Sequence, residues 1–260
     1  MTSIARYLGI DYSGAETPTS RLKGLQVYSA APGTEPVKVG TPAGEGWNWT
    51  RKELAQWLLD QLLSGPPIIA GIDHGFSFPM AYFERHGLPA DWPAFLDDFQ
   101  KHWPTDGDHT YVDFLRDGTR GNAAARSGDS RWRRLTELRA LGAKSVFHFD
   151  VPGSVAKSTH AGLPWLRYLR REAGERVHFW PFDGFEVPAG SSVVAEVYPR
   201  LMRRGPHPSG LTPHEYDAWA VARWLKHADE SGSLVHHFAP ELAEEEKRIA
   251  RMEGWILGVA

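Results

Sequence analysis

Three acidic side chains stand at the ends of apolar segments that are typical of buried strands. Asp11 ends the run RYLGID, Asp73 ends PIIAGID, and Glu196 lies near the end of SVVAEVY. A carboxylate in such a run costs several kcal/mol to remove from water unless it is paired, hydrogen-bonded or bound to a cation. Because strand ends on one side of a parallel or mixed sheet form the edge where ligands bind, these acids are candidates for one shared site.

Asp217 is a fourth candidate, and it is carried by a predicted helix. The segment TPHE at 212–215 is a capping box with proline at the first helical position, so a helix begins there and runs to about residue 229. Its apolar residues at positions 218, 221, 222 and 225 define a stripe that faces the sheet. His214 and Asp217 lie on that same side, since residues three and four apart are helix neighbours. We therefore expect Asp217 to point toward the core.

Clustered carboxylates repel one another and take up protons unless a cation neutralises them. The chain has no cysteine, so a metal here must be held by oxygen and imidazole ligands. Mg²⁺ or Mn²⁺ suits such ligands, and two ions roughly 3.5–4 Å apart stabilise both oxygens of a phosphoryl displacement. An isolated acid at a strand end more often forms a turn, so the prediction depends on the whole set. The predicted catalytic residues are Asp11, Asp73, Glu196, Asp217 and His214, and the four acids are the predicted metal ligands.

The elements that must position these acids begin with a predicted meander of three strands. These strands are expected at Arg6–Asp11, Leu22–Tyr28 and Pro36–Val39. A second capping box at Thr50 starts a helix, which Gly65 and Pro66 end. The strand predicted at Pro67–Asp73 follows it. A strand, a helix and another strand in this order favour a right-handed crossover onto a parallel neighbour.

From about residue 80 to 175 the sequence predicts helices and loops that cover one end of the sheet. We therefore expect one α/β domain over residues 1–260 with a largely helical insertion at about 80–175. The helices expected in the insertion are Asp91–Trp103, Arg131–Leu141 and Ser158–Glu172. After it, the expected elements are strands at Val177–Phe182 and Val193–Tyr198, the helix from Thr212, a surface helix at Pro240–Glu253 and a last strand at Trp255–Val259.

Five short motifs resemble those of a known family. They are GIDYSG at 9–14, GID at 71–73, AEVYP at 195–199, HxxDA at 214–218 and EGWI at 253–256. Their order is similar to that of a large family of uncharacterised proteins that are predicted to be nucleases and are related to the Holliday-junction resolvase RuvC. The resemblance spans nearly the whole chain. It implies a ribonuclease H-like fold, in which an antiparallel meander leads into a helix and parallel strands.

The same resemblance implies metal ligation by Asp11, by Asp73, and by Asp217 with His214 three residues before it. Glu196 matches the family's Glu-x-Tyr-Pro motif. The expected activity is metal-dependent hydrolysis of nucleic acid, with DNA and RNA both open as substrates. Because RuvC is a dimer, a monomer and a dimer both stay open for this chain.

A basic segment accompanies the acids. Residues 116–144 hold eight basic and three acidic side chains, a local net charge of +5 within a chain of net charge −3. A basic segment near a metal site can follow a phosphate backbone, and Trp132 can stack on a base. The alternative is a solvated helix face. The predicted nucleic-acid contacts are Arg131, Arg133, Arg134 and Lys157.

Two other functions stay open. Actin-like ATPases and sugar kinases also place Gly-x-Asp turns around phosphate, although a pair of such domains usually needs more than 260 residues. A non-catalytic scaffold that binds nucleic acid is the other alternative. The segment GSVAKST at 153–159 ends like a Walker A loop but lacks the glycine spacing, so it is not predicted to be one.

Composition sets wide bounds on these functions. The chain is 42% apolar and 23% charged, which is typical of a globular protein. Its net charge of −3 excludes binding to nucleic acid through overall charge alone. No apolar run approaches the ~18 residues of a membrane span, and the N-terminal residues lack the pattern of an export signal. We therefore expect a cytoplasmic protein.

Overall fold

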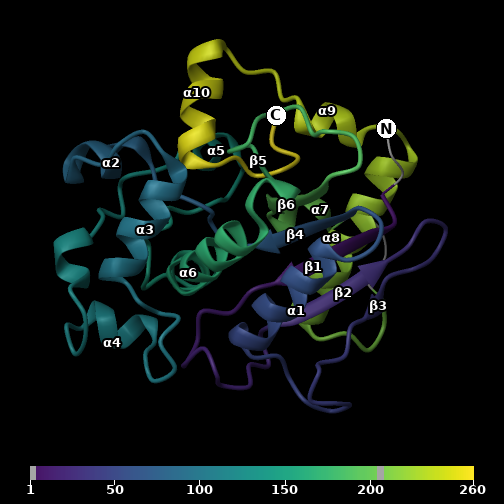
Figure 1. Ribbon diagram of the computed structural model, residues 1–260, viewed down its shortest axis with the longest axis horizontal. Helices are drawn as coiled ribbons and strands as arrows, with labels where there is room; N and C mark the ends of the chain where they lie inside the picture. Colours follow the sequence, from purple (N-terminus) through teal and green to yellow (C-terminus); the bar gives the residue numbers. More distant parts are fainter. Residues whose placement is uncertain (1–3, 204–207) are drawn as a thin grey trace.

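The computed structural model describes residues 4–203 and 208–260. Its centre is a six-stranded mixed sheet with the order β3-β2-β1-β4-β6-β5 (Figure 1). The strands β1 (Arg6–Asp11), β4 (Ile68–Asp73), β6 (Ser192–Glu196) and β5 (Val177–Trp180) are parallel. The strands β2 (Gln26–Ala30) and β3 (Val37–Lys38) are antiparallel to their neighbours. The predicted order of an antiparallel meander followed by parallel strands is confirmed.

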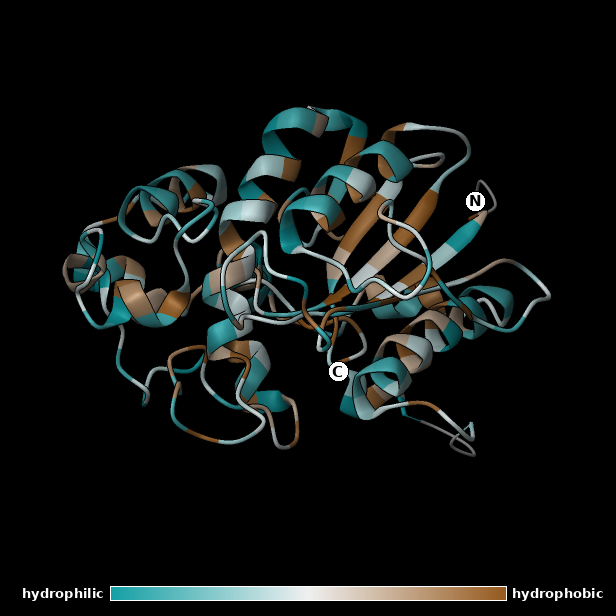
Figure 2. Cartoon of the chain, turned by 90° about the horizontal axis from the view of Figure 1, so that it is seen from below, coloured by the Kyte–Doolittle hydropathy of each residue, from teal (hydrophilic) through white to brown (hydrophobic). Residues whose placement is uncertain are grey.

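Helices cover both faces of the sheet (Figure 2), and the side chains of each strand point alternately to the two faces. Leu8 and Ile10 of β1 belong to the core that includes α1 (Arg51–Leu63) and α6 (Ala156–Ala173). Tyr7 and the neighbouring odd-numbered positions face α8 (Pro213–Glu230). Each strand therefore presents every second residue to one helical layer and the others to the opposite layer.

Two glycines bring α8 unusually close to the sheet. A Cβ atom on Gly9 would lie 2.0 Å from the carbonyl oxygen of Ala218, and one on Gly71 would lie 2.9 Å from Cγ1 of Val221. Any side chain at position 9 would therefore collide with the helix backbone. The helix that carries Asp217 is held directly against the central strands β1 and β4.

The remaining helices lie largely around one side and one end of this sheet (Figure 1). They are α2 (Met80–His86), α3 (Trp92–His102), α4 (Val112–Arg116), η1 (Ala123–Arg126), α5 (Leu135–Arg139), η2 (Gly174–Arg176), α7 (Pro199–Met202), α9 (Leu234–Phe238) and α10 (Glu244–Glu253). Residues 80–176 thus hold only helices and loops, as predicted. In the described part of the chain, no helix is both long and apolar enough to cross a membrane.

Several predicted boundaries need correction. The second strand begins at Gln26 rather than Leu22, because residues 22–25 form a turn. The Leu25 N–H donates a hydrogen bond to the Leu22 carbonyl oxygen at 3.1 Å. The helix expected at Arg131–Leu141 is only α5, and the helix expected from Pro240 begins at Glu244.

The last predicted strand, Trp255–Val259, is wrong. This segment has no strand structure, although Trp255 and Leu257 are fully buried. The Leu257 N–H donates a single hydrogen bond to the carbonyl oxygen of Glu196 at 2.9 Å. The segment is apolar because it fills the core beside β6, and a short apolar run of this kind does not reveal whether it also pairs as a strand.

Candidate functional site

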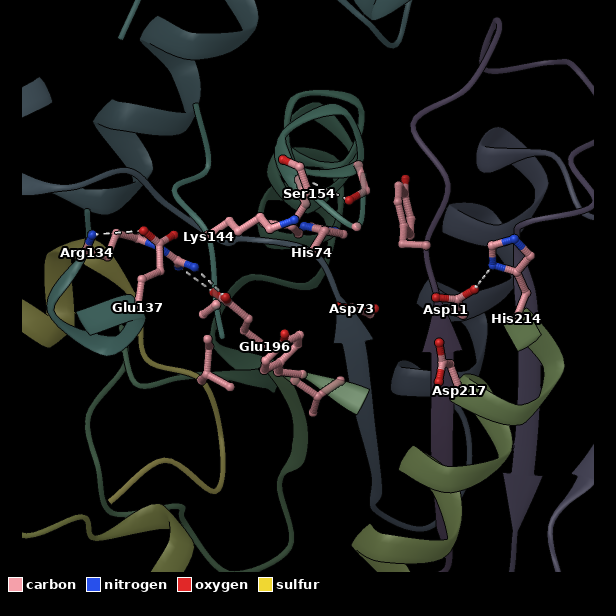
Figure 3. Close-up of a pocket in the computed structure, with 18 residues that line it drawn as sticks. Asp11, Asp73, His74, Arg134, Glu137, Lys144, Ser154, Glu196, His214 and Asp217 are labelled. Atoms are coloured by element: carbon pink, nitrogen blue, oxygen red, sulfur yellow. Dashed lines mark hydrogen bonds and ion pairs between the residues drawn. The ribbon is translucent and has the colours of Figure 1, made fainter. Parts of the chain in front are cut away.

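Asp11 and Asp73 lie side by side at the ends of neighbouring parallel strands. They are direct register partners in the β1–β4 pair, and both extend the row of odd-numbered residues that faces α8. Asp217, on the second turn of α8, points toward them (Figure 3). The structure therefore brings together three of the four predicted acids, and the close approach of α8 determines the third.

Burial and mutual repulsion make these acids hard to ionise together. Burial raises the pKa of Asp11 from 3.8 to about 6, against a lowering effect of His214. Burial also raises the pKa of Asp73 well above its ordinary value, and the neighbouring carboxylates of Asp11 and Asp217 add to the shift. Without a cation, the strand-end pair therefore resists carrying two full negative charges at neutral pH.

Two basic side chains partly neutralise the cluster. Nδ1 of His214 is 2.7 Å from Oδ2 of Asp11, and this hydrogen bond raises the pKa of the histidine. Arg203, which follows α7, donates two hydrogen bonds to the Asp217 carboxylate at 2.5 and 2.6 Å. The Asp73 carboxylate accepts no hydrogen bond from any described residue. Asp73 is therefore a half-buried acid that lacks a counterion of its own.

Glu196 does not join this cluster. It is in register with Ile72 rather than with Asp73, so its side chain leaves the sheet on the opposite face. There, Arg134 donates hydrogen bonds to both carboxylate oxygens at 2.6 and 2.7 Å, and the Phe76 N–H donates another at 3.0 Å. The prediction that Glu196 is a metal ligand beside the three aspartates is not matched by the geometry, because its oxygens are already satisfied.

Arg134 links Glu196 to a second buried acid. Its Nε donates to Glu137 at 2.8 Å, and the Arg134 side chain is 1% exposed. One guanidinium therefore lies between two carboxylates in the interior, a buried ion triad at the far end of the site (Figure 3). Arg134 is predicted from the sequence to contact nucleic acid. In the structure it is instead the buried counterion of Glu137 and Glu196.

The other predicted nucleic-acid contacts are also largely engaged. Arg133 donates to the backbone carbonyls of Glu137 and Ala143. Arg131 is paired with Asp129 at 2.6 Å, although its side chain is 87% exposed, and Lys157 is paired with Asp113 at 2.8 Å. The basic segment therefore carries less free positive charge than its composition suggests.

A cavity of about 240 Å³ joins the two ends of the site. The three aspartates and His214 line one end, and Arg134 and Glu137 line the other. Between them, the cavity is bordered by the start of α6 and the loop before it (Figure 3). We call this cavity the acid cleft. Its additional lining residues include Tyr12, His74, Lys144, Ser154, Ser158 and Tyr198.

The sequence pointed to some of these additional residues and not to others. Tyr12 and His74 directly follow the strand-end acids, so their position after a strand was a usable signal. Lys144 and Ser154 come from the loop segment before α6, which no periodicity places at the cleft. Arg203 also lacked a signal, since its partner Asp217 lies on a different helix.

Among the residues that line the cleft, the three aspartates have the donor chemistry that suits a hard divalent cation. A bound cation would stabilise the ionised forms of Asp11 and Asp73, whose pKa values are raised, and would give Asp73 a partner. Carboxylate oxygens are also the ligands that Mg²⁺ and Mn²⁺ prefer. Over residues 4–203 and 208–260, no three His, Asp or Glu side chains converge tightly enough to enclose an ion as they stand. Binding would require Asp217 to exchange Arg203 for the cation. Glu196 does not fit, because Arg134 already occupies it.

Comparison with known proteins found no match, whether to a family model, to a curated protein or to a solved structure. The function must therefore be inferred from the site itself.

Proposed function

We propose that this protein is a metal-dependent nuclease of the ribonuclease H-like, RuvC-related type, which hydrolyses phosphodiester bonds in nucleic acid. The observation that carries the proposal is the pair Asp11 and Asp73, direct register partners at the ends of parallel strands. Asp217 faces this pair, and Asp73 has no counterion of its own. The order of the sheet, an antiparallel meander beside parallel strands, agrees with the resemblance.

Asp11, Asp73 and Asp217 would hold Mg²⁺ or Mn²⁺. Such a cation would neutralise phosphate charge and make a bound water more acidic. The chain itself supplies the orientation of the three carboxylates, which two strands and the closely packed α8 fix relative to one another.

His214 and Arg203 would act beside the aspartates. The His214 ring is half-exposed at the mouth of the acid cleft, and its contact with Asp11 favours the protonated form. It is therefore placed to hold or release a proton at the reacting phosphate. Arg203 is permanently charged, and its guanidinium can leave Asp217 and bind a substrate phosphate instead.

The test is hydrolysis of labelled single-stranded DNA, duplex DNA, four-way junction DNA and RNA with Mg²⁺, with Mn²⁺ and with EDTA. We expect cleavage of at least one substrate that EDTA abolishes and that Asp73→Asn lowers by roughly a hundredfold or more. Asp60→Asn, which changes an exposed carboxylate on α1, is the matched control and should keep full activity. Metal-independent cleavage, or full activity of Asp73→Asn, would contradict the proposal. ATP hydrolysis that needs Asp11 and Asp73 would favour a phosphotransferase.

A further inference from the structure

A second cavity, of about 450 Å³, lies between the helices of residues 80–150 and the first turns of α6. We call it the aromatic cavity, because its lining includes the rings of Trp103, Phe147, Phe149 and His160. Its polar lining includes Arg116, Ser127, Ser130, His148 and Asp150. A volume of this size is typical of small-molecule sites, in which apolar walls surround a few oriented polar groups.

His160 gives this cavity a defined hydrogen-bonding group. The residue is 1% exposed, and its Nδ1 is 2.9 Å from the carbonyl oxygen of Ala156. Burial lowers the pKa of His160 to about 3, so the ring is neutral at physiological pH. Because a carbonyl oxygen only accepts, Nδ1 must carry the proton, and Nε2 is left as an acceptor. Among the described residues, no donor reaches this atom.

The rings are arranged for stacking. Trp103 and Phe149 are nearly parallel, with 9° between their planes and centroids 6.3 Å apart. Phe149 is half-buried, and the Arg116 guanidinium lies 4.9 Å from its centroid. Aromatic faces with an adjacent arginine are what proteins use to hold unpaired bases of a nucleic-acid strand.

The aromatic cavity and the acid cleft are lined by neighbouring residues of one loop and one helix. In the loop before α6, Lys144, Gly153 and Ser154 line the cleft, whereas His148, Asp150 and Val151 line the aromatic cavity. On α6 itself, Ser158 borders the cleft and His160 borders the cavity. One loop and one turn of α6 therefore contribute residues to both cavities.

We propose that the aromatic cavity binds an unpaired nucleobase of the same strand whose phosphates lie in the acid cleft. The base stacks on Phe149 and donates an N–H hydrogen bond to Nε2 of His160. This inference rests on the proposed function for its substrate, and it assigns single-stranded or locally unpaired nucleic acid to that site. Every common base carries an N–H donor, so the cavity selects unpaired bases rather than a particular sequence.

The test measures binding of a fluorescein-labelled single-stranded DNA oligonucleotide by anisotropy, beside the same strand with its central bases replaced by abasic sites. Ca²⁺ replaces Mg²⁺ so that a hard cation is present while hydrolysis is suppressed. We expect the wild type to bind the intact strand roughly tenfold more tightly than the abasic strand. Phe149→Leu keeps apolar bulk but removes the ring, so it should lose this preference and bind the abasic strand unchanged. Phe149→Tyr should keep the preference.

His160→Phe keeps a ring but removes both the Nε2 acceptor and the Nδ1–H bond to the Ala156 carbonyl. It should lose part of the preference, and its melting temperature measures how much stability the second loss costs. Trp47→Ala, an exposed aromatic outside both cavities, is the control and should behave as wild type. Equal binding of the two strands by the wild type, or a retained preference in Phe149→Leu, would overturn the inference.

Two further arms separate the explanations. If adenosine monophosphate alone competes as strongly as the oligonucleotide, the cavity is a free-nucleotide site and the strand assignment is wrong. The proposed nuclease activity can fail independently of the inference. A preference for intact strands without metal-dependent cleavage would reject the activity and retain the base site, and cleavage without the preference would do the reverse.

Discussion

The two ends of the acid cleft hold similar acids in very different electrostatic settings. Glu196 and Glu137 share the buried Arg134, whose guanidinium lies within 2.8 Å of both carboxylates. Asp11 and Asp73 have no such internal counterion, and their neighbours His214 and Arg203 are both partly exposed. A buried acid is therefore not by itself a sign of a ligand. The informative acid is the one whose charge the protein leaves unbalanced.

The first way to break this comparison is to remove the internal counterion. Arg134→Met would leave Glu196 and Glu137 buried without a positive partner, and we expect it to lower the free energy of unfolding by about 3–5 kcal/mol. Urea unfolding followed by circular dichroism measures the change. Adding Glu137→Gln and Glu196→Gln to this variant should recover much of the loss. A change below about 1 kcal/mol for Arg134→Met would show that Glu196 and Glu137 do not depend on Arg134 as their counterion.

At the aspartate end of the acid cleft, we expect a substitution to raise the free energy of unfolding rather than lower it. Asp73→Asn removes a carboxylate whose charge burial and its neighbours disfavour, so the metal-free protein should become more stable. We expect Mn²⁺ to raise the melting temperature of the wild type and the same substitution to abolish this rise. Thermal melts with and without Mn²⁺ measure both effects, and Asp60→Asn should change neither. A destabilised Asp73→Asn would show that Asp73 has a structural partner.

The pH dependence of stability sharpens the comparison further. The pKa of Asp11 is raised from 3.8 to about 6 in the folded protein, so the folded state binds its proton more tightly than the unfolded state does. The stabilisation from that proton is complete below the ordinary pKa and is lost as pH rises through about 6.

Between pH 3.8 and pH 6, wild-type metal-free protein should therefore lose about 2 kcal/mol more stability than Asp11→Asn does. Urea titrations at several pH values measure the difference. Parallel curves for the two proteins would contradict the raised pKa.

The aspartate end was predictable from the sequence because its signals are local. Asp11 and Asp73 stand at strand ends, and a capping box with a helical stripe places His214 and Asp217 on the sheet-facing side. These four residues do come together. An antiparallel meander followed by parallel strands was also predicted, from the order of the apolar runs and from the resemblance.

The glutamate end was not predictable for a physical reason. A strand buried on both faces has no alternation of polar and apolar residues, so the face to which Glu196 points depends on register alone. The partner Arg134 is 62 residues away in sequence. The engagement of Arg131, Arg133 and Lys157 was hidden for a related reason, since a count of charges does not show which acids and carbonyls lie beside them.

The contact between Gly9 and α8 makes the site vulnerable at a distance. A single methyl group at position 9 would force strand and helix apart. Its carbon would lie only 2.0 Å from the carbonyl oxygen of Ala218, far closer than a van der Waals contact allows. The helix would be pushed outward and would carry Asp217 and His214 away from Asp11. The arrangement of the three aspartates thus depends on a residue that has no side chain. An alanine at position 9 would disturb that arrangement although every acid is still present.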